Sequence, residues 1–316
     1  SQATHSFTAT ATDAAGNPSA ASSAYTVTID TTPPAVPLIT SFDKDSGIVG
    51  DHITNDTKLM INGTAEVNSI VTVYRDGTPI VTTTANGSGN WTVVDNDTLA
   101  NGVTYQYTAT ATDAAANVSD LSASYDAIID TSVAAPTELD LAAIDDSGSS
   151  PIDNITNKTS GLTISGSAAE EGATITIFDD VNNNGVQNGS EATLGTATVL
   201  GGTFSTDITL GAGLHHVVAT QTDVAGNVSG GSTALDITVD TAAPSAPVVA
   251  SITSDSGSSG TDEITNDNTL LINGTAAANS SVEVFKDGVS IGVTTANGAG
   301  AWTFDYTGTA LADGTY

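Results

Sequence analysis

The most specific chemical pattern in the chain is the stretch DVNNNGVQNGSE, residues 180–191. It matches D-x-[DN]-x-[DN]-G-x5-E, the spacing of a twelve-residue calcium loop. ATITIF before it and ATLGTATV after it alternate like strands, so we expect this loop on a hairpin and not between two helices. The alternative is a solvated hairpin tip without an ion. The predicted ligands of one Ca²⁺ are Asp180, Asn182, Asn184, the carbonyl of Val186, Asn188 (directly or through water) and Glu191.

Three other acidic motifs recur about every hundred residues. They read TDAAGNPS, IDTTPPAVP and DKDSGIVGDHITND where they first occur. A step of this length is the size of a compact domain, not of a solenoid repeat, so the chain consists of periods of one module. The second full period carries an insertion of about nine residues, which contains the calcium-type loop. The motifs begin at Thr12, Thr112 and Thr222, at Ile29, Ile129 and Val239, and at Asp43, Asp145 and Ser254.

Composition excludes several classes of function. Five basic and 36 acidic residues give a net charge of −31, which argues against binding to nucleic acids or to anionic membrane surfaces and favours divalent cations. No apolar run is long enough to cross a membrane. The chain has no cysteine, no HExxH and no G-x-S-x-G, so no catalytic residues are predicted and the protein is not expected to be an enzyme. His215 is expected at the edge of a core.

The strand pattern predicts the architecture. TYQYTATATD alternates with period two, SIVTVYRDGTPIVTTT is typical of a hairpin around Asp76-Gly77, and no segment has a helical period. Seven short strands per hundred residues predict an all-β chain of tandem seven-stranded immunoglobulin-like β-sandwiches in a linear rod. The expected domains are a fragment with strands F and G at 1–34, complete modules at 35–134 and 135–244, and a fragment with strands A to E at 245–316.

Large aromatic residues stand at equivalent positions of the periods, at Trp91, Phe204 and Trp302. A role in stacking against a ligand is conceivable for such residues. Because large aromatic side chains dominate the cores of small domains, we expect them to be core anchors on strand E.

Taken as a set, the motifs DSG…D.ITN, INGTA, YRDGTPI, NGSGNW, TATATDAAGNPS and IDTTPPAVP resemble the bacterial immunoglobulin-like repeats of giant, type I-secreted, RTX-type adhesins. The resemblance covers the whole chain. It implies an extracellular stalk at the bacterial cell surface that projects a distal adhesion domain and is often stiffened by calcium at the domain junctions. FDDVNNNGVQNGSEATLGT departs from the YRDGTPI pattern, which puts the hairpin geometry of that period in doubt.

Strand topology predicts which motifs meet at a junction. In such a sandwich the A–B loop and the last residue of strand G lie at the C-terminal end, and the F–G loop lies at the N-terminal end. The junction between the complete modules should therefore combine Asp45 and Asp51, with Asp95 or Asp97 as further candidates, linker Asp130, and Asp223 with Asn227. Junctional Ca²⁺ is predicted from these ligands; the alternative is solvated acidic linkers beside ordinary turns. The ligands expected at the other junctions are Asp30 with Asp113 and Asn117, and Asp146 and Asp153 with Asp240.

Three functions remain open on the sequence. The first is a structural stalk whose partners are the neighbouring modules of the same chain, serving attachment and biofilm formation. The second is a set of ligand-binding modules for glycans or surfaces, and the third is accessory domains of a secreted polysaccharide-active enzyme. Near-identical loops in every period favour the stalk, because a receptor site would usually be elaborated in one module.

Overall fold

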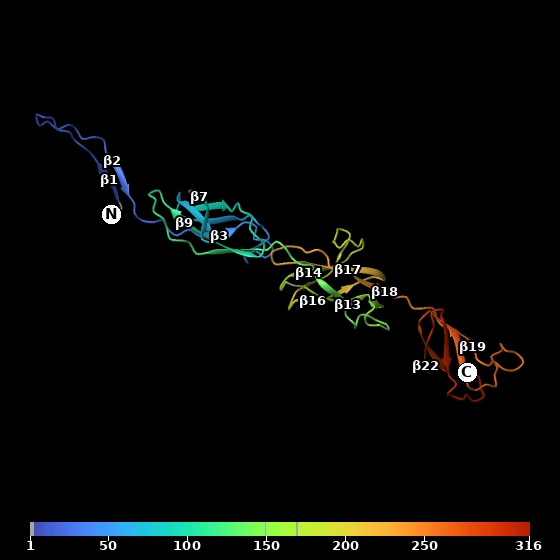
Figure 1. Ribbon diagram of the computed structural model, residues 1–316. Helices are drawn as coiled ribbons and strands as arrows, with labels where there is room; N and C mark the ends of the chain where they lie inside the picture. Colours follow the sequence, from blue (N-terminus) through green and yellow to red (C-terminus); the bar gives the residue numbers. More distant parts are fainter. Residues whose placement is uncertain (1–2, 149, 169) are drawn as a thin grey trace. The chain divides into compact units, whose positions relative to one another are not determined.

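The computed structural model describes residues 3–148, 150–168 and 170–316, and its regular elements are all β-strands (Figure 1). The chain divides into two compact units, Ser1–Asp240 and Thr241–Tyr316. The first unit begins with β1 (Ala3–Phe7) and β2 (Tyr25–Ile29), an antiparallel pair in which Phe7 is opposite Tyr25. Both of these aromatic side chains are exposed.

The region 35–134 is a sandwich of two sheets. One sheet has the order β3-β5-β8 and the other β4-β10-β9-β6-β7, and every pairing is antiparallel except that of β10 with β4. The strands are β3 (Leu38–Phe42), β4 (Ile53–Thr54), β5 (Met60–Thr64), β6 (Ile70–Arg75), β7 (Thr78–Thr84), β8 (Asn90–Val94), β9 (Val103–Thr112) and β10 (Tyr125–Ile129).

Strand A differs from the expectation. The strand pattern predicts the DSG…D.ITN stretch to be the A–B loop, but its last residues form a second half of strand A. β3 pairs with β5 in one sheet, and β4 pairs in parallel with β10 in the other. The acidic turn at residues 43–52 therefore lies where strand A changes sheets, with Lys44 and His52 at φ of 58° and 66°.

The core of this sandwich lies between the two sheets. It contains Ile61 and Trp91 from the three-stranded sheet and Val73 and Ala109 from the five-stranded sheet. Trp91 is 3% exposed, which confirms its predicted place in the core. A Cβ on Gly63 would overlap the Trp91 ring, so the glycine of INGTA leaves space for the indole.

The region 135–244 repeats this sandwich. Its sheets have the orders β11-β13-β16 and β12-β18-β17-β14-β15, and β14 and β17 lie side by side (Figure 1). Phe204 takes the place of the tryptophan in a separate core cluster. The strands are β11 (Thr137–Leu141), β12 (Ile155–Thr156), β13 (Ser160–Ser167), β14 (Thr174–Asp179), β15 (Thr193–Thr198), β16 (Thr203–Thr209), β17 (Gly213–Thr222) and β18 (Leu235–Val239).

The second unit contains the first strands of the same pattern. Its sheets have the orders β19-β20-β23 and β21-β22, around a smaller core that includes Val284 and Trp302. Lys286 lies over the Tyr316 ring at 4.4 Å, as Arg75 lies over Tyr105 at 5.5 Å. The strands are β19 (Val248–Ile252), β20 (Leu271–Thr275), β21 (Ser281–Lys286), β22 (Val289–Thr295) and β23 (Ala301–Asp305).

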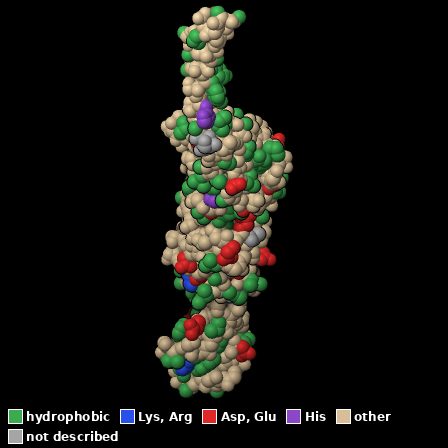
Figure 2. All heavy atoms as spheres, turned by 90° about the vertical axis from the view of Figure 1, so that its left-hand side faces the viewer, with side chains coloured by type: hydrophobic (Ala, Val, Ile, Leu, Met, Phe, Trp, Pro, Cys, Tyr) green, Lys and Arg blue, Asp and Glu red, His purple; other side chains and the backbone are tan. Residues whose placement is uncertain are grey.

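Most residues of the chain are uncharged, and the charged ones are mainly acidic. Figure 2 shows acidic side chains scattered over one face, with few Lys or Arg side chains among them. Within the residues that the structure describes, no helix is long and apolar enough to cross a membrane. The excess of carboxylates therefore makes local clusters of acidic groups the features to examine for a function.

Candidate metal centre

The aspartate of TDAAGN and its copies holds the turn between strands F and G. In the middle copy, Asp113 Oδ1 accepts the backbone N–H groups of Ala115 and Asn117, each at 2.8 Å. Its Oδ2 accepts the side-chain amide of Asn117 at 2.8 Å. These hydrogen bonds favour the carboxylate, so the pKa of Asp113 is lowered, chiefly by Asn117. Asp13 and Asp223 make the corresponding bonds to their own asparagines.

The asparagine of the same turn joins it to the preceding linker. Asn117 Nδ2 donates to the carbonyl of Asp30 at 3.2 Å. Asn227 Nδ2 donates to the carbonyl of Asp130 at 2.9 Å, also in the linker before its module. The structure thus brings the F–G loop and the linker together at both of these places, as the strand topology predicts.

A carboxylate cluster forms at the second of these places. Among the described residues, ligand oxygens of Asp130, Glu170 and Asp223 all lie within 4.8 Å of one another. Asp130 and Glu170 are half-buried and Asp223 is buried. The pKa of Glu170 is raised, first by burial and then by the negative charges of the two aspartates. The three groups therefore repel one another unless a proton or a cation lies between them.

Glu170 is absent from the ligands predicted on the sequence. It lies in the loop between β13 and β14, which is a B–C loop at the same end of the module as the F–G loop. The turn is repeated one module earlier: Ser69 N–H donates to the Glu66 carbonyl at 3.0 Å, as Ala173 N–H donates to that of Glu170 at 3.3 Å. The paired glutamates of two periods were the signal that could have identified this position.

The acidic turn of the preceding module docks on the same F–G loop. Ser46 Oγ donates to the carbonyl of Ala225 at 2.6 Å, and Ile48 N–H donates to the carbonyl of Val224 at 3.0 Å. A Cβ on Gly47 would overlap the Val224 carbonyl, so only glycine allows this approach. The three elements predicted for this junction therefore meet, although they contact one another partly through backbone groups.

The aspartates of the docked turn are not part of this cluster. Asp45 Oδ2 accepts Gly50 N–H at 2.6 Å, and Asp51 Oδ1 accepts Ile53 N–H at 2.9 Å. Within the described residues, Oδ1 of Asp45 is buried without a hydrogen-bond partner.

The corresponding turn of the next module has the same arrangement. Asp146 is 5% exposed; its Oδ2 accepts Asn154 N–H at 3.1 Å, and its Oδ1 has no partner among the described residues. Asp153 caps its own turn through Ile155 N–H at 3.2 Å. Asp240 N–H donates to the Thr156 carbonyl at 2.8 Å, which places this predicted linker ligand at the end of β18.

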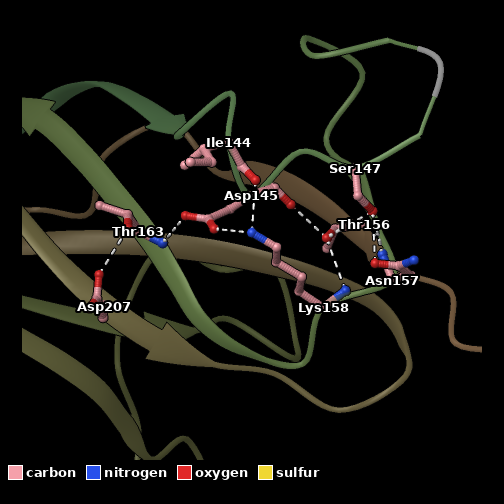
Figure 3. Close-up of polar contacts among 8 residues, drawn as sticks. All are labelled: Ile144, Asp145, Ser147, Thr156, Asn157, Lys158, Thr163 and Asp207. Carbon is pink, nitrogen blue, oxygen red and sulfur yellow. Dashed lines mark hydrogen bonds and ion pairs between the residues drawn. The ribbon is translucent and has the colours of Figure 1, made fainter.

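The neighbouring Asp145 is fully occupied by partners of its own module (Figure 3). Its Oδ1 pairs with Lys158 Nζ at 2.8 Å and its Oδ2 accepts Thr163 N–H at 3.0 Å. Lys158, followed by the bond from Thr163, lowers the pKa of Asp145. Asp145 therefore fixes the turn, whereas Asp146 leaves one carboxylate oxygen uncompensated.

Asp95 and Asp97, the further candidates at the junction, have a different partner. Arg75 binds both of them at 2.7 Å, and Tyr107 OH donates to the buried Asp95 at 2.8 Å. Burial and then the bond to Asp95 raise the pKa of Tyr107. This network stabilises the end of the sandwich near β6 and leaves these two carboxylates with a cation of their own. His215 is half-buried, as expected, and its Nδ1 lies 2.7 Å from Asp179 Oδ2.

The calcium-type loop lies where the sequence places it, between β14 and β15, and not between helices. Asp180 and Glu191, its first and last residues, are 1% and 6% exposed. Val181 and Val186 between them are exposed. The two acidic residues are therefore buried although the loop is at the surface.

Comparison with known proteins identifies the modules. The family model described as Bacterial Ig-like domain matches residues 32–131, 132–241 and 243–316. Its borders lie within a few residues of the complete modules expected at 35–134 and 135–244. The described elements, all strands arranged in paired sheets, agree with an immunoglobulin-like fold.

Several other proteins are similar to parts of the chain. Exoglucanase B of Cellulomonas fimi is 31% identical over 284 residues, which are 85% of this chain and 24% of that protein. The chain thus spans about a quarter of the length of this curated relative. The fibronectin(III)-like modules of Clostridium thermocellum CbhA match at 17% identity and a TM-score of 0.37, over 64% of this chain and 94% of that one. The BSP domain of a biofilm associated protein matches at 20% identity and a TM-score of 0.22, over 60% of this chain and 29% of that one.

Proposed function

The chain belongs to the family of bacterial Ig-like domains, and we propose that its modules are structural extender repeats of a bacterial cell-surface adhesin. In this proposal they project a distal adhesion domain for attachment and biofilm formation, and the parent protein is a type I-secreted adhesin of the RTX type. The modules are non-catalytic and extracellular, and their partners are neighbouring modules of the same chain.

The observation that carries the proposal is the carboxylate cluster at the junction after Asp130. A structural repeat must control the angle between modules, and here the linker, the B–C loop and the F–G loop contribute one acidic residue each. The docked turn at Ser46 and Ile48 adds hydrogen bonds between modules. Two modules joined in this way move less freely than two modules on a free linker.

We propose that Ca²⁺ completes this junction. Calcium is coordinated by oxygen ligands at about 2.3–2.6 Å, so two ligands of one ion lie up to about 5 Å apart. The ligand oxygens of Asp130, Glu170 and Asp223, which all lie within 4.8 Å of one another, fit that limit. Burial, followed by the negative charges of Asp223 and Asp130, raises the pKa of Glu170, so a cation at this place would offset both effects. The unpartnered oxygens of Asp45 and Asp146 keep these two aspartates as further candidate ligands at their ends of the modules.

Asp30 with Asp113 and Asn117 would form the corresponding junction before residue 35. The bond from Asn117 to the Asp30 carbonyl supports this placement. Glu66, in the same turn position as Glu170, would supply the third carboxylate there. The residues Asp51, Asp153 and Asp240 hold their own turns and strand ends, and remain weaker candidates for ligands.

Small-angle scattering of the full chain tests the proposal. With Ca²⁺ we expect a larger and more sharply defined maximum dimension than with a chelator, because pinned junctions restrict bending. Asp130→Asn combined with Asp223→Asn should abolish the difference, and Glu171→Gln, at an exposed glutamate next to the cluster, should retain it. Equal dimensions in both buffers for the unmodified chain would reject calcium-dependent stiffening.

A second function is favoured by the match to Exoglucanase B, namely accessory modules of a secreted polysaccharide-active enzyme. Direct binding of glycans by the modules is the remaining alternative. A glycan array probed with the full chain separates these functions from the first one. Extender repeats should give no specific signal, whereas saturable binding to one polysaccharide class would favour modules that recognise a ligand.

A further inference from the structure

We propose that the loop 180–191 is a calcium site inside a single module, independent of the junctions. One Ca²⁺ would be bound by Asp180, Asn182, Asn184, the carbonyl of Val186, Asn188 and Glu191. The equivalent hairpin of the module 35–134 turns at Asp76-Gly77 and has no such loop. The proposal therefore assigns a metal site to one module and not to the others.

The loop backbone already curves around its first residue. Asp180 Oδ1 accepts Asn184 N–H at 3.1 Å, and its Oδ2 accepts Gly185 N–H at 2.6 Å. Gly185, the sixth residue of the loop, has a φ of 72°, which a side chain would disfavour. These bonds fold the fifth and sixth positions of the loop around the Asp180 carboxylate.

The last residue of the loop supplies the second, independent observation. Glu191 is 6% exposed, and its Oε2 accepts the N–H of Asn188 at 3.0 Å, so the carboxylate is turned toward the loop. Its Oε1 is buried and has no hydrogen-bond partner among the described residues. The described ion pairs do not include Glu191 or Asp180. Burying a carboxylate oxygen such as Glu191 Oε1 with neither a cation nor a hydrogen bond is unfavourable, and a bound cation would compensate it together with the buried charge of Asp180.

The ligand set indicates calcium of modest affinity. Asparagine at the third and fifth positions leaves two charged ligands, and fewer charges weaken binding, as in extracellular modules with Kd values of about 10⁻⁴–10⁻³ M. A terminal glutamate can bind through both oxygens, which suits the larger coordination number of Ca²⁺. Mg²⁺ requires octahedral geometry and should bind more weakly.

Occupation of the loop would affect the whole module, because the loop is connected to the strand beside it. Asp180 N–H donates to the carbonyl of His216 on β17 at 2.8 Å. A Cβ on Gly231 would overlap the Gly185 carbonyl, so the loop lies directly against the segment that follows β17. Calcium in the loop should therefore stabilise the hairpin and its contact with this segment.

A tryptophan placed in the loop gives a local test in the full chain. Val186 is 59% exposed and would contribute only its backbone carbonyl, so Val186→Trp keeps the ligand set and places an indole beside the ion. Tb³⁺ replaces Ca²⁺ at oxygen sites and emits when an adjacent indole is excited. We expect emission well above that of the unmodified chain, with competition by Ca²⁺ in the range of the Kd given above.

Matched variants separate the outcomes. Adding Glu191→Gln to Val186→Trp should remove the extra emission, and adding Glu171→Gln should not. Combining Glu170→Gln and Asp223→Asn should also leave it unchanged, so the junction proposal can fail without affecting this one. Extra emission that survives Glu191→Gln, or its absence with Val186→Trp alone, would overturn the site. Crystals of the unmodified chain grown in Ca²⁺ give a second test free of folding effects, because the absence of anomalous density beside Asp180 would also overturn it.

Discussion

The repulsion within the junction cluster leads to a prediction in which the sign of a stability effect depends on calcium. Two unit charges no more than 4.8 Å apart repel by at least about 0.9 kcal/mol at the dielectric constant of water and by at least about 3.5 kcal/mol at an effective value of 20. Glu170 takes part in two of the three pairs of the cluster. Because Glu170 is only half-buried, solvent screens both of its pairs, and with the lower figure for each pair neutralising it should relieve about 2 kcal/mol.

Without calcium, Glu170→Gln should therefore strengthen the docking of the two modules. With saturating calcium the same change removes a charged ligand, and docking should weaken by about tenfold, or about 1.4 kcal/mol. The local reporter is the N–H of Ile48, which is hydrogen-bonded to the Val224 carbonyl of the next module. Its hydrogen exchange, followed by mass spectrometry on the peptide 44–50, measures docking separately from unfolding.

The expected result is slower exchange than in the unmodified chain in chelator and faster exchange in calcium. Glu171→Gln, an exposed neighbour with the same change of charge, should be neutral in both buffers. Faster exchange of Glu170→Gln in both buffers would mean that Glu170 only holds the loop. Unchanged exchange would mean that the cluster carries no coupling between modules, and either result would refute the electrostatic argument.

Three further predictions concern the acidic turns and the junction cluster. Gly47→Ala should release the docked turn and increase exchange of the peptide 44–50 at least tenfold, whereas Gly50→Ala, also at positive φ but in open space, should not. Asp145→Lys and Lys158→Asp should each lower the free energy of unfolding of their module by about 2–3 kcal/mol, measured by scanning calorimetry. The double variant restores the opposite charges and should recover about 1–2 kcal/mol of the sum of the two losses. Losses that simply add would show that the pair is not coupled. Because the pKa of Asp145 is lowered in the folded module, its contribution to the stability of that module is fully present above its pKa in the unfolded chain. This contribution is lost as the pH falls through the pKa in the folded module. The raised pKa of Glu170 gives a pH dependence of the opposite sign. Without calcium, docking of the two modules should tighten as the pH falls through that pKa, whereas the affinity for calcium should decrease. A calcium titration at several pH values that shows constant affinity would contradict this.

Local patterns determined most of what could be predicted about the fold. The alternation of residues 103–112 gives β9, and the pair Asp76-Gly77, with φ of 50° and 77°, turns the hairpin of β6 and β7. Trp91 was expected in the core because few side chains are large enough to fill it. Each of these inferences depends on residues close together in sequence, where the chemistry of a turn or the period of a strand is visible directly.

Features that depend on pairing between distant segments were not visible. The split of strand A rests on two residues, Ile53 and Thr54, that pair with β10 about 75 residues later. Glu170 was missed for a related reason, since its role depends on a linker forty residues earlier and a loop fifty residues later. The contact between the F–G loop and the linker could be predicted because the motifs of both recur in each period. The glutamate of the B–C loop recurs in two periods only and is replaced by Ala277 in the third.

Comparison of the periods separates positions that hold a turn from positions that act beyond it. Lys44 pairs with Asp56 at 3.1 Å, and the same two positions in the next module carry the reversed pair of Asp145 and Lys158 at 2.8 Å. In the third module these positions are occupied by Ser254 and Asp267, and the pKa of Asp267 is lowered first by hydrogen bonds from Thr269 and then by one from Ser254. Any complementary pair therefore serves to fix this turn.

The next residue along the turn behaves differently. It is an aspartate in every period, at Asp45, Asp146 and Asp255, and within the described residues each has a buried Oδ1 without a partner. If this residue served only its own turn, a side chain with all of its polar atoms satisfied would be favoured, because an unpaired buried oxygen costs about 1–3 kcal/mol. A carboxylate that is present at this cost in all three turns is consistent with a cation as its missing partner, which is why Asp45 and Asp146 remain candidate ligands although they lie outside the cluster around Glu170.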